Sequence, residues 1–561
     1  MGEATTRYQE RALCSLGKGS HAQPEFSESQ AVCGAGVLFL LPSLIAQGLL
    51  KAKDVYRIPA SHYYGIESVV MTLAFMALSR IKNPEQLKLC KPGEIGRLIG
   101  LDRIPEMKCL RDKIKLLSEQ NQTTELNNAL VDIWYPQDNR SGADFLYIDG
   151  HVRIYYGSKA NLPSKFVSRQ KLCLSATSEF WVNDAKGMPV MMVMGELTEK
   201  LQTVIEGQIV PRLIGSRLIS DIIEPIEAPQ CTLVFDREAY EPAFFARLWE
   251  KYRIATLTYR KNVKDKWKED NFENTEITVM GQHINMDLCE QETQLGGYFL
   301  REVRRLGANG HQTAIITNNP KLKTKEIAGR MFARWSQENF FRYLIQDYDF
   351  DKMISYGIET IDMEKVVVNP QYRKLTHKLK KIREKRQRIE AKFYPLMEQA
   401  IDEHLDKIPV ITDKQMQYKQ QIDQLAAEEK SLVQARKRLQ PKIKLAQMSE
   451  NERYNKLKTE SKILMNVIKM ICYRAESAVA SILEPYLANA HKEKRMVVKQ
   501  IIQSNADLIP NYKENTLTVK LYSLAAKRYN EAVKSIIHIL NDSETIFPGT
   551  KLKMVFDSSA I

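Results

Sequence analysis

Three acidic residues stand where they could act together on a phosphate ester. Asp149 ends the apolar run FLYID and Asp236 ends CTLVFD, and both runs are typical of β-strands. If these strands are neighbours in one sheet, the two carboxylates emerge at the same edge. Glu338 lies in RWSQENFFR, within a segment from Lys323 to Tyr348 that predicts one long helix. We therefore expect a carboxylate cluster built from two strands and a helix.

Such a cluster suits metal-assisted phosphoryl transfer. Two Mg²⁺ ions ~3.5–4 Å apart activate an attacking oxygen and stabilise a leaving oxygen on a phosphodiester. Carboxylate oxygens are the hard ligands that Mg²⁺ prefers, with waters and substrate phosphate completing its shell. Arg334 and Arg342 lie four residues before and after Glu338, on one helical face with it. We expect these arginines to contact phosphate oxygens.

Each acid also has a purely structural interpretation. An aspartate after a strand commonly forms a turn or caps a helix, and Glu338 with its two arginines could form an i,i+4 salt-bridge ladder. Other acids lie close by in the sequence and compete for the same role: Asp144, Asp184, Glu238, Asp347, Asp349 and Asp351.

The surrounding elements alternate between strand and helix. KLCLSATSEFWVN and MPVMMVMGEL, joined by DAKG, predict a hairpin that follows FLYIDGHVRIYYG. A helix from about Leu197 to Ile223, the buried strand CTLVFD, the helix EPAFFARLWEKY and the strand IATLTYR come next. Three strands followed by alternating helix and strand indicate an α/β fold. A second β-rich stretch, at about 265–318, precedes the helix of Glu338.

The sequence pattern of the N-terminal region indicates a polar segment followed by helices. Residues 1–30 are polar and we expect them to be loose, whereas residues 31–135 are predicted to be helical. Two short helices separated by GLDR form a candidate helix-turn-helix, whose second helix offers cations to DNA phosphates: Lys108, Arg111, Lys113 and Lys115. A helical hairpin that only packs is the alternative.

The pattern in the C-terminal part indicates mainly helices. Apolar residues at three- and four-residue spacing over 370–448, interrupted near Pro409, predict an antiparallel coiled-coil hairpin. Its first arm is strongly basic, which suits either a solvated face or contact with DNA. Residues 449–561 predict a helical region that ends in a strand, TIFPGTKLKMVFD.

Composition narrows the functional class. The net charge of +14 favours a polyanionic partner, with nucleic acid ahead of an anionic membrane. The eight cysteines form no Cys-x-x-Cys pair, which argues against a zinc knuckle and favours a reducing compartment. The longest apolar run, Gly34 to Leu50, is shorter than a membrane span and is interrupted by Pro42. We expect it to be buried in a soluble protein.

Residues 140–350 resemble the bacterial insertion-sequence transposases of the DDE class. YIDGH is similar to the family's first-aspartate strand and LVFDRE to its second, and IITNNPKLKTKEIAGRMFARWSQENFFR resembles the strand, loop and helix that carry the glutamate. The family spaces Tyr, Arg, Glu and Lys along that helix. Here Arg334 and Glu338 fit, whereas Met331 and Ile345 stand at the tyrosine and lysine positions.

The resemblance implies a ribonuclease H-like catalytic domain with a β insertion. It implies that Asp149, Asp236 and Glu338 bind two Mg²⁺ or Mn²⁺ ions, and that Arg334 and Arg342 contact DNA. The implied reaction is cleavage at mobile-element ends and transfer of the 3′-hydroxyl into target DNA. The implied partners are double-stranded DNA and at least a second protomer, in the cytoplasm at the nucleoid. Two alternatives stay open: a transposase-derived DNA-binding scaffold without catalysis, and a stand-alone metal-dependent nuclease.

Overall fold

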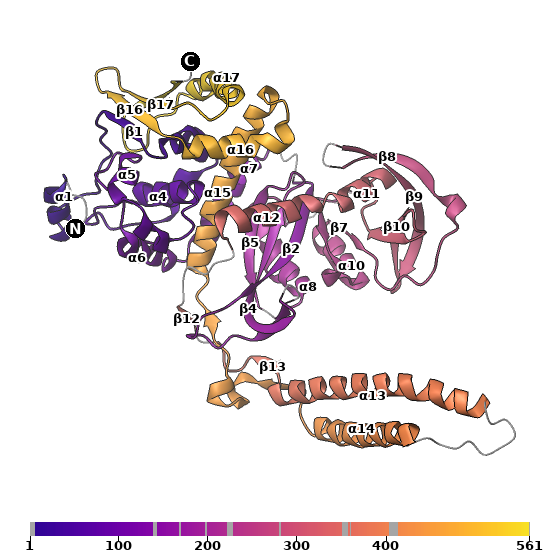
Figure 1. The fold of residues 1–561 in the computed structure, drawn as a ribbon. Coiled ribbons are helices and arrows are strands. Elements are labelled where there is room, and N and C mark those ends of the chain that lie inside the picture. Colours follow the sequence, from indigo (N-terminus) through magenta and orange to yellow (C-terminus); the bar gives the residue numbers. More distant parts are fainter. Residues whose placement is uncertain are drawn as a thin grey trace. The chain divides into compact units, whose positions relative to one another are not determined.

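The computed structural model describes residues 6–138, 143–167, 170–196, 199–221, 228–279, 282–350, 357–359, 361–402 and 413–559. The chain forms two compact units (Figure 1). Unit 1 comprises residues 1–156, 163–356 and 458–561, and unit 2 comprises residues 157–162 and 357–457. Unit 2 is thus an insertion between two parts of unit 1.

A mixed sheet organises the middle of unit 1. Its first five strands, in spatial order β5–β4–β2–β6–β7, are Pro189–Gly195, Leu172–Asn183, Phe145–Ile154, Cys231–Phe235 and Ile254–Tyr259. Strand β4 pairs antiparallel with both β5 and β2, whereas β6 runs parallel to β2 and to β7. Every residue of β6 is buried, as its unbroken apolar sequence predicts for a central strand. The α/β class inferred from the sequence is therefore confirmed.

The sheet continues beyond β7 through strands that the sequence placed in its second β-rich stretch. In spatial order they are β11 (Gln312–Thr317), β10 (Tyr298–Leu306), β9 (Gln282–Leu295) and β8 (Glu273–Val279), all antiparallel to their neighbours. The short β3 (Ser164–Val167) pairs with the start of β4. Because β11, the last of these strands in the chain, pairs with β7, the chain lies next to the first five strands just before α11 and α12 begin.

Helices cover the two faces of the sheet. Leu146 and Ile148 pack with helices α8 (Leu201–Val204), α9 (Val210–Gly215) and α10 (Pro242–Tyr252). Phe145 and Tyr147, which alternate with them along β2, pack instead with α11 (Thr324–Phe332). Helix α12 (Trp335–Tyr348) lies on the same face as α11, across β2 and β4 (Figure 1).

The single long helix predicted over 323–348 is wrong. Helix α11 ends at Phe332 and α12 begins at Trp335. The hydroxyl of Tyr147 donates a 3.0 Å hydrogen bond to the carbonyl of Arg330, and the backbone N–H of Arg334 bonds to Met331 rather than to Arg330. A side chain from the sheet therefore takes the carbonyl that would have continued the helix.

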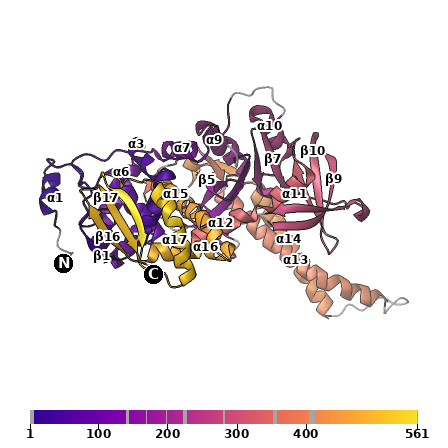
Figure 2. The same ribbon diagram turned by 90° about the horizontal axis from the view of Figure 1, so that it is seen from above.

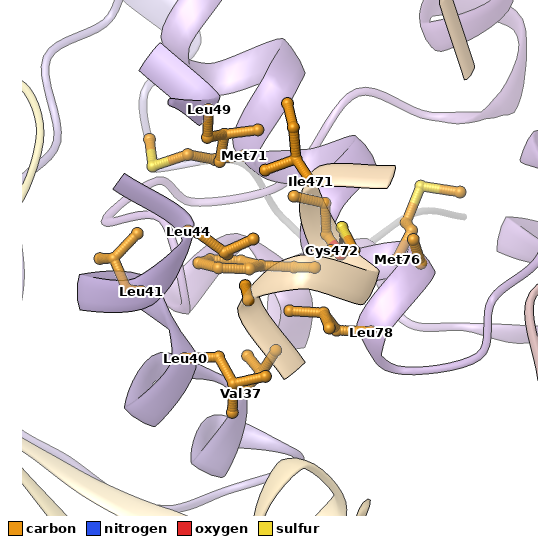
Figure 3. Close-up of a cluster of buried hydrophobic side chains, with 14 of the residues drawn as sticks. Val37, Leu40, Leu41, Leu44, Leu49, Met71, Met76, Leu78, Ile471 and Cys472 are labelled. Atoms are coloured by element: carbon orange, nitrogen blue, oxygen red, sulfur yellow. Dashed lines mark hydrogen bonds between the residues drawn. The ribbon is translucent and has the colours of Figure 1, made fainter. Parts of the chain in front are cut away.

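A helical core forms the rest of unit 1. Helix α15 (Glu460–Leu483) packs against α2 (Leu41–Ala46), α4 (Ile66–Leu78), α6 (Met107–Ser118) and α7 (Thr123–Trp134). Figure 3 shows side chains from α2, α4, α15 and the short helices η1 (Ala35–Leu40) and η2 (Leu49–Lys51) meeting in one apolar cluster: Val37, Leu40, Leu41, Leu44, Leu49, Met71, Met76, Leu78, Ile471 and Cys472. The apolar run from Gly34 is helical and buried, as predicted. No single helix among the described residues is long and apolar enough to cross a membrane, although the bent pair Ala35–Ala46 and Leu49–Val55 meets that requirement jointly.

The chain ends of unit 1 meet in a four-stranded sheet (Figure 2). Its strands are β1 (Ser29–Val32), β16 (Ala506–Asn511), β17 (Thr516–Leu521) and β18 (Lys553–Ser558), with α16 (Ala490–Gln503) and α17 (Lys527–Asp542) in the same region. Strand β18 agrees with the predicted C-terminal strand. The expectation of a mainly helical region at 449–561 did not include β16 and β17, and the expectation of a loose N-terminus did not include α1 (Tyr8–Ser15) and β1.

The candidate helix-turn-helix has an unsuitable geometry. Its first member, α5 (Pro92–Arg97), is only six residues long. In α6, Lys113 is buried at 7 % exposure and contacts His62, so its amine does not project into solvent. Leu110 and Leu117 on the same helix are also buried. The alternative, a helical pair that packs into the core, describes these residues better.

Unit 2 is built around two long helices, α13 (Pro370–Asp402) and α14 (Asp413–Lys437). They run antiparallel, because Arg386 contacts Glu429 whereas the later residue Leu396 contacts the earlier residue Gln415. Short strand pairs lie at their base: β12 (Ile358–Glu359) with β15 (Lys456–Leu457), and β13 (Val366–Val368) with β14 (Lys442–Lys444). Pro409, the predicted interruption, lies outside the described residues.

Candidate active site

The two predicted aspartates follow paired positions on adjacent parallel strands. Ile148 of β2 is the partner of Phe235 of β6, so Asp149 and Asp236 are the next residues on their strands. Side chains alternate along a strand. Asp149 therefore faces the same side as Tyr147, and Asp236 the same side as Val234, which both pack with α11. The sheet thus presents both carboxylates on the face that carries α11 and α12.

The carboxyl group of Asp149 is held in a mostly buried and partly anionic environment. Burial raises the pKa of Asp149 to about 6, and the nearby carboxylates of Asp236 and Glu238 act in the same direction. Arg334 and the backbone N–H of Gly150 oppose the shift by stabilising the charged form. An acid with several anionic neighbours is typical of sites that hold a cation.

Arg334 is the cation nearest to Asp236 among its described contacts. Its Nη1 atom lies 3.5 Å from Oδ1 of Asp236, and its side chain is only 13 % exposed. Asp236 also accepts a 2.7 Å hydrogen bond from the N–H of Arg237 and caps the short helix η5 (Arg237–Ala239). The capping role considered from the sequence is therefore present, and it leaves the second carboxylate oxygen available.

Glu338 lies in the first turn of α12 and is exposed. Its neighbour Gln337 is buried and anchors this turn, because Gln337 Nε2 donates to the carbonyls of Tyr147 and Trp181 at 3.1 and 3.2 Å. Tyr259, at the end of β7, lies close enough to Arg334, Asp236 and Glu338 for each of their charges to act on its pKa. Burial raises the pKa of Tyr259, Arg334 lowers it, and Asp236 and Glu338 both raise it. Glu338 thus shares this neighbourhood with Asp236 and Arg334.

The remaining family positions divide between surface and core. Arg342 is exposed one turn beyond Glu338. Met331, at the family's tyrosine position, is fully buried, and Ile345, at its lysine position, packs against the helical core. The two departures from the family spacing are therefore packing positions in this fold.

Glu238 is one of the nearby acids that the sequence offered as alternatives to the three predicted carboxylates. Its Oε2 atom lies 3.9 Å from the position that a Cβ on Gly150 would occupy, and its charge acts on Asp149. The signal in the sequence is DRE: two acids one residue apart directly after a buried strand. Glu238 is thus a fourth carboxylate at this edge.

Most other rival acids have structural partners. Asp184 accepts hydrogen bonds from the Tyr135 hydroxyl and from two backbone N–H groups of its own turn. Asp347 pairs with Arg80, and Asp349 pairs with Lys82. Asp144 is exposed. Asp351 lies outside the described residues.

The site has the donor chemistry of a magnesium centre without the closed geometry of one. Among the described residues, no three His, Cys, Asp or Glu side chains approach closely enough to hold a metal ion together. Asp149, Asp236, Glu238 and Glu338 nevertheless offer hard oxygen atoms of the type that Mg²⁺ and Mn²⁺ bind.

The far end of α12 is fixed by buried charges. Glu476 of α15 accepts hydrogen bonds from the hydroxyls of Tyr343 (2.6 Å) and Tyr348 (2.5 Å). Lys469 donates a 2.8 Å hydrogen bond to the carbonyl of Tyr348, and Lys462 donates to the carbonyl of Phe350. Cations at the C-terminal carbonyls of a helix satisfy orphan acceptors and oppose its dipole. The helix that carries Glu338 is therefore attached at both ends.

Two aspartates on neighbouring parallel strands, beside a helix with a glutamate and arginines, form an arrangement suited to enzymes that act on phosphate esters. The sequence profile of a family described as "Transposase protein" matches residues 2–560. The chain belongs to this transposase family, which supports a role in transposition and, in general terms, DNA cleavage. A search of curated proteins finds no match to the chain.

Proposed function

We propose that this transposase uses the DDE mechanism on a ribonuclease H-like core. The observation that carries the proposal is the register of β2 and β6, which puts Asp149 and Asp236 on one face of the sheet beside α12. The strand order β5–β4–β2–β6–β7 supports it, because three antiparallel strands followed by two parallel ones resemble the ribonuclease H arrangement. Strands β8–β10 then correspond to the family's β insertion before the last catalytic helix.

In this proposal Asp149, Asp236 and Glu338 hold two Mg²⁺ or Mn²⁺ ions, which supply Lewis acidity at the scissile phosphate. Glu238 adds negative charge that favours cation binding at Asp149. Arg334 would contact a phosphate oxygen of the bound DNA, and Arg342, one helical turn beyond Glu338, would contact DNA as well. The protein acts on double-stranded element ends and target DNA. Two protomers or more assemble on the two ends, and the reaction takes place at the bacterial nucleoid.

Strand cleavage and strand joining test the proposal separately. The substrate is a labelled duplex that carries the flanking ends of the element, with and without Mg²⁺. We expect Asp149→Asn, Asp236→Asn and Glu338→Gln each to lower both rates by at least ~10³-fold while DNA binding persists. The matched control is Glu250→Gln, which neutralises an exposed acid on α10, on the other side of the sheet.

Three results would lead to other conclusions. Wild-type protein that binds the ends but performs no metal-dependent chemistry would indicate the non-catalytic scaffold. Cleavage without joining would indicate a nuclease. Full activity of Glu338→Gln together with inactivity of Glu238→Gln would move the third ligand from α12 to the segment after β6.

A further inference from the structure

Helix α13 carries a row of six cations along one flank. The residues Leu375, Leu379, Ile382, Arg386, Ile389 and Phe393 line its contact with α14 or lie partly buried beside it. One position before each of these stands an exposed basic residue: Lys374, Lys378, Lys381, Lys385, Arg388 and Lys392. We call these six residues the basic row. Spacings of three and four residues place them on one face of the helix.

The basic row has little compensating charge. The only acids of α13 between residues 373 and 392 are Glu384 and Glu390, and they pair with Lys380 and Arg386, outside the row. Among the ion pairs formed by described residues, the row contributes one, between Lys374 and Glu452 at 3.6 Å. Like charges at this spacing destabilise an isolated helix. An external polyanion would remove that repulsion.

The helical pair holds the row in a straight line. Glu429 of α14 lies between Arg383 and Arg386 of α13, at 2.6 Å from each, and Leu379 is buried beside them. These contacts fix the rotation of α13 about its own axis. From Lys374 to Lys392 the row extends ~27 Å at ~1.5 Å per residue, with a cation every ~5 Å. That length is slightly less than one ~34 Å turn of B-DNA.

We propose that the basic row binds the phosphate backbone of double-stranded DNA. A linear row of flexible amines complements a linear row of phosphates, and the chain belongs to a transposase family. Such contacts position a duplex without reading its sequence. The inference depends on DNA being the substrate in the proposed function, although it does not depend on the DDE mechanism.

The test compares two variants of the full chain that each lose four positive charges. The row variant replaces Lys378, Lys381, Lys385 and Lys392 with Gln. The control variant replaces Lys414, Lys419, Lys430 and Lys437, exposed lysines of α14 at irregular spacing, with Gln. Gln and Lys have similar helix propensities, and circular dichroism checks that both variants retain their helices. Binding to a labelled duplex of arbitrary sequence is measured by anisotropy over a KCl series without divalent metal.

We expect the row variant to bind at least ~10-fold more weakly at low salt. Its slope of log affinity against log salt should fall by about 3 to 4, because each phosphate contact contributes ~0.9. The control should change affinity less than ~3-fold. Equal losses in both variants, or unchanged affinity in the row variant, would overturn the proposal.

A second measurement separates this inference from the catalytic proposal. The row variant should need at least ~10-fold more protein than wild type for half-maximal cleavage of an element-end duplex in Mg²⁺, whereas Asp149→Asn should bind normally and not cleave. If wild type never cleaves but the row variant loses affinity selectively, the DDE proposal fails and the role of the basic row stands. If cleavage follows the predictions and the row variant binds like wild type, the reverse conclusion holds.

Discussion

Arg80 and Glu476 form a buried ion pair, with Nη2 and Oε1 2.8 Å apart, that connects the end of α4 to α15 beside helix α12. The Glu476 side chain is fully buried and that of Arg80 is 10 % exposed. Removing one partner of such a pair leaves a charge in a low-dielectric environment and costs ~3–5 kcal/mol. The pair therefore makes the placement of α12 dependent on two residues far from it in the sequence.

Glu476→Gln should destabilise unit 1 by about 3 kcal/mol, the low end of that range, because Asp347 also contacts Arg80 at 3.2 Å. The midpoint of denaturant unfolding measures this loss. The matched control is Glu67→Gln, which breaks an exposed pair with Lys53 and should cost less than ~1 kcal/mol. Equal effects of the two substitutions would contradict a structural role for the buried pair.

The acid limb of the pH–rate profile should reflect Asp149. A carboxyl group must lose its proton to bind a cation, and the pKa of Asp149 is raised to about 6. Metal-dependent cleavage should therefore rise about tenfold per pH unit below pH 6 and level off above it. Glu238→Gln removes one negative charge beside Asp149, so the limb should move to lower pH. Glu250→Gln should leave the acid limb at the wild-type pH. An acid limb that does not move in Glu238→Gln would argue against electrostatic coupling of Asp149 and Glu238.

Asp149→Asn should stabilise the metal-free protein at neutral pH. The folded-state pKa of Asp149, about 6, lies above its ordinary value of 3.8, so the folded state retains the proton longer than the unfolded chain. Wild-type stability relative to the variant should therefore decline between pH 4 and pH 6 and stay constant above. Thermal unfolding at several pH values checks this sign. Added Mg²⁺ should reverse the order by stabilising only the wild type.

Lys469→Met should loosen the C-terminal end of α12. The substitution keeps the apolar stem of this buried side chain but removes the hydrogen bond to the Tyr348 carbonyl and the charge at the helix end. We expect a loss of about 1–2 kcal/mol, as for other cations at helix C-termini. Hydrogen exchange should show faster opening of the last turn of α12. Protection equal to wild type in that turn would show that the lysine contributes packing alone.

The sequence was sufficient to predict the elements that carry the carboxylates. Asp149 and Asp236 follow apolar runs whose period and length identify strands without any tertiary information. The prediction that both aspartates lie at one edge of the sheet required the two strands to be neighbours, and β2 and β6 are paired in the structure. Glu238 was underestimated because DRE looks like an ordinary turn. Its proximity to Gly150 arises from the parallel pairing of β2 with β6, two segments about ninety residues apart in the sequence.

Other features depended on tertiary contacts that no local pattern contains. The break between α11 and α12 arises from the Tyr147 hydroxyl, which comes from a distant strand. Strands β16 and β17 form a sheet with β1, whose residue Ser29 pairs with Leu508. Lys113 looked like a DNA contact on a helical face and is buried against His62.

The insertion of unit 2 also delays the completion of the contacts of α12 during synthesis. Lys462 and Lys469, whose amines bind the last carbonyls of the α12 segment, follow those carbonyls by 112 and 121 residues. At ~5–20 residues per second, a ribosome adds that length in roughly 6 to 24 seconds. During this time the strands that carry Asp149 and Asp236 have been synthesised, whereas the helix that carries Glu338 still lacks its contacts with α15. The end of α12 therefore gains its buried cations only after the C-terminal region has emerged from the ribosome.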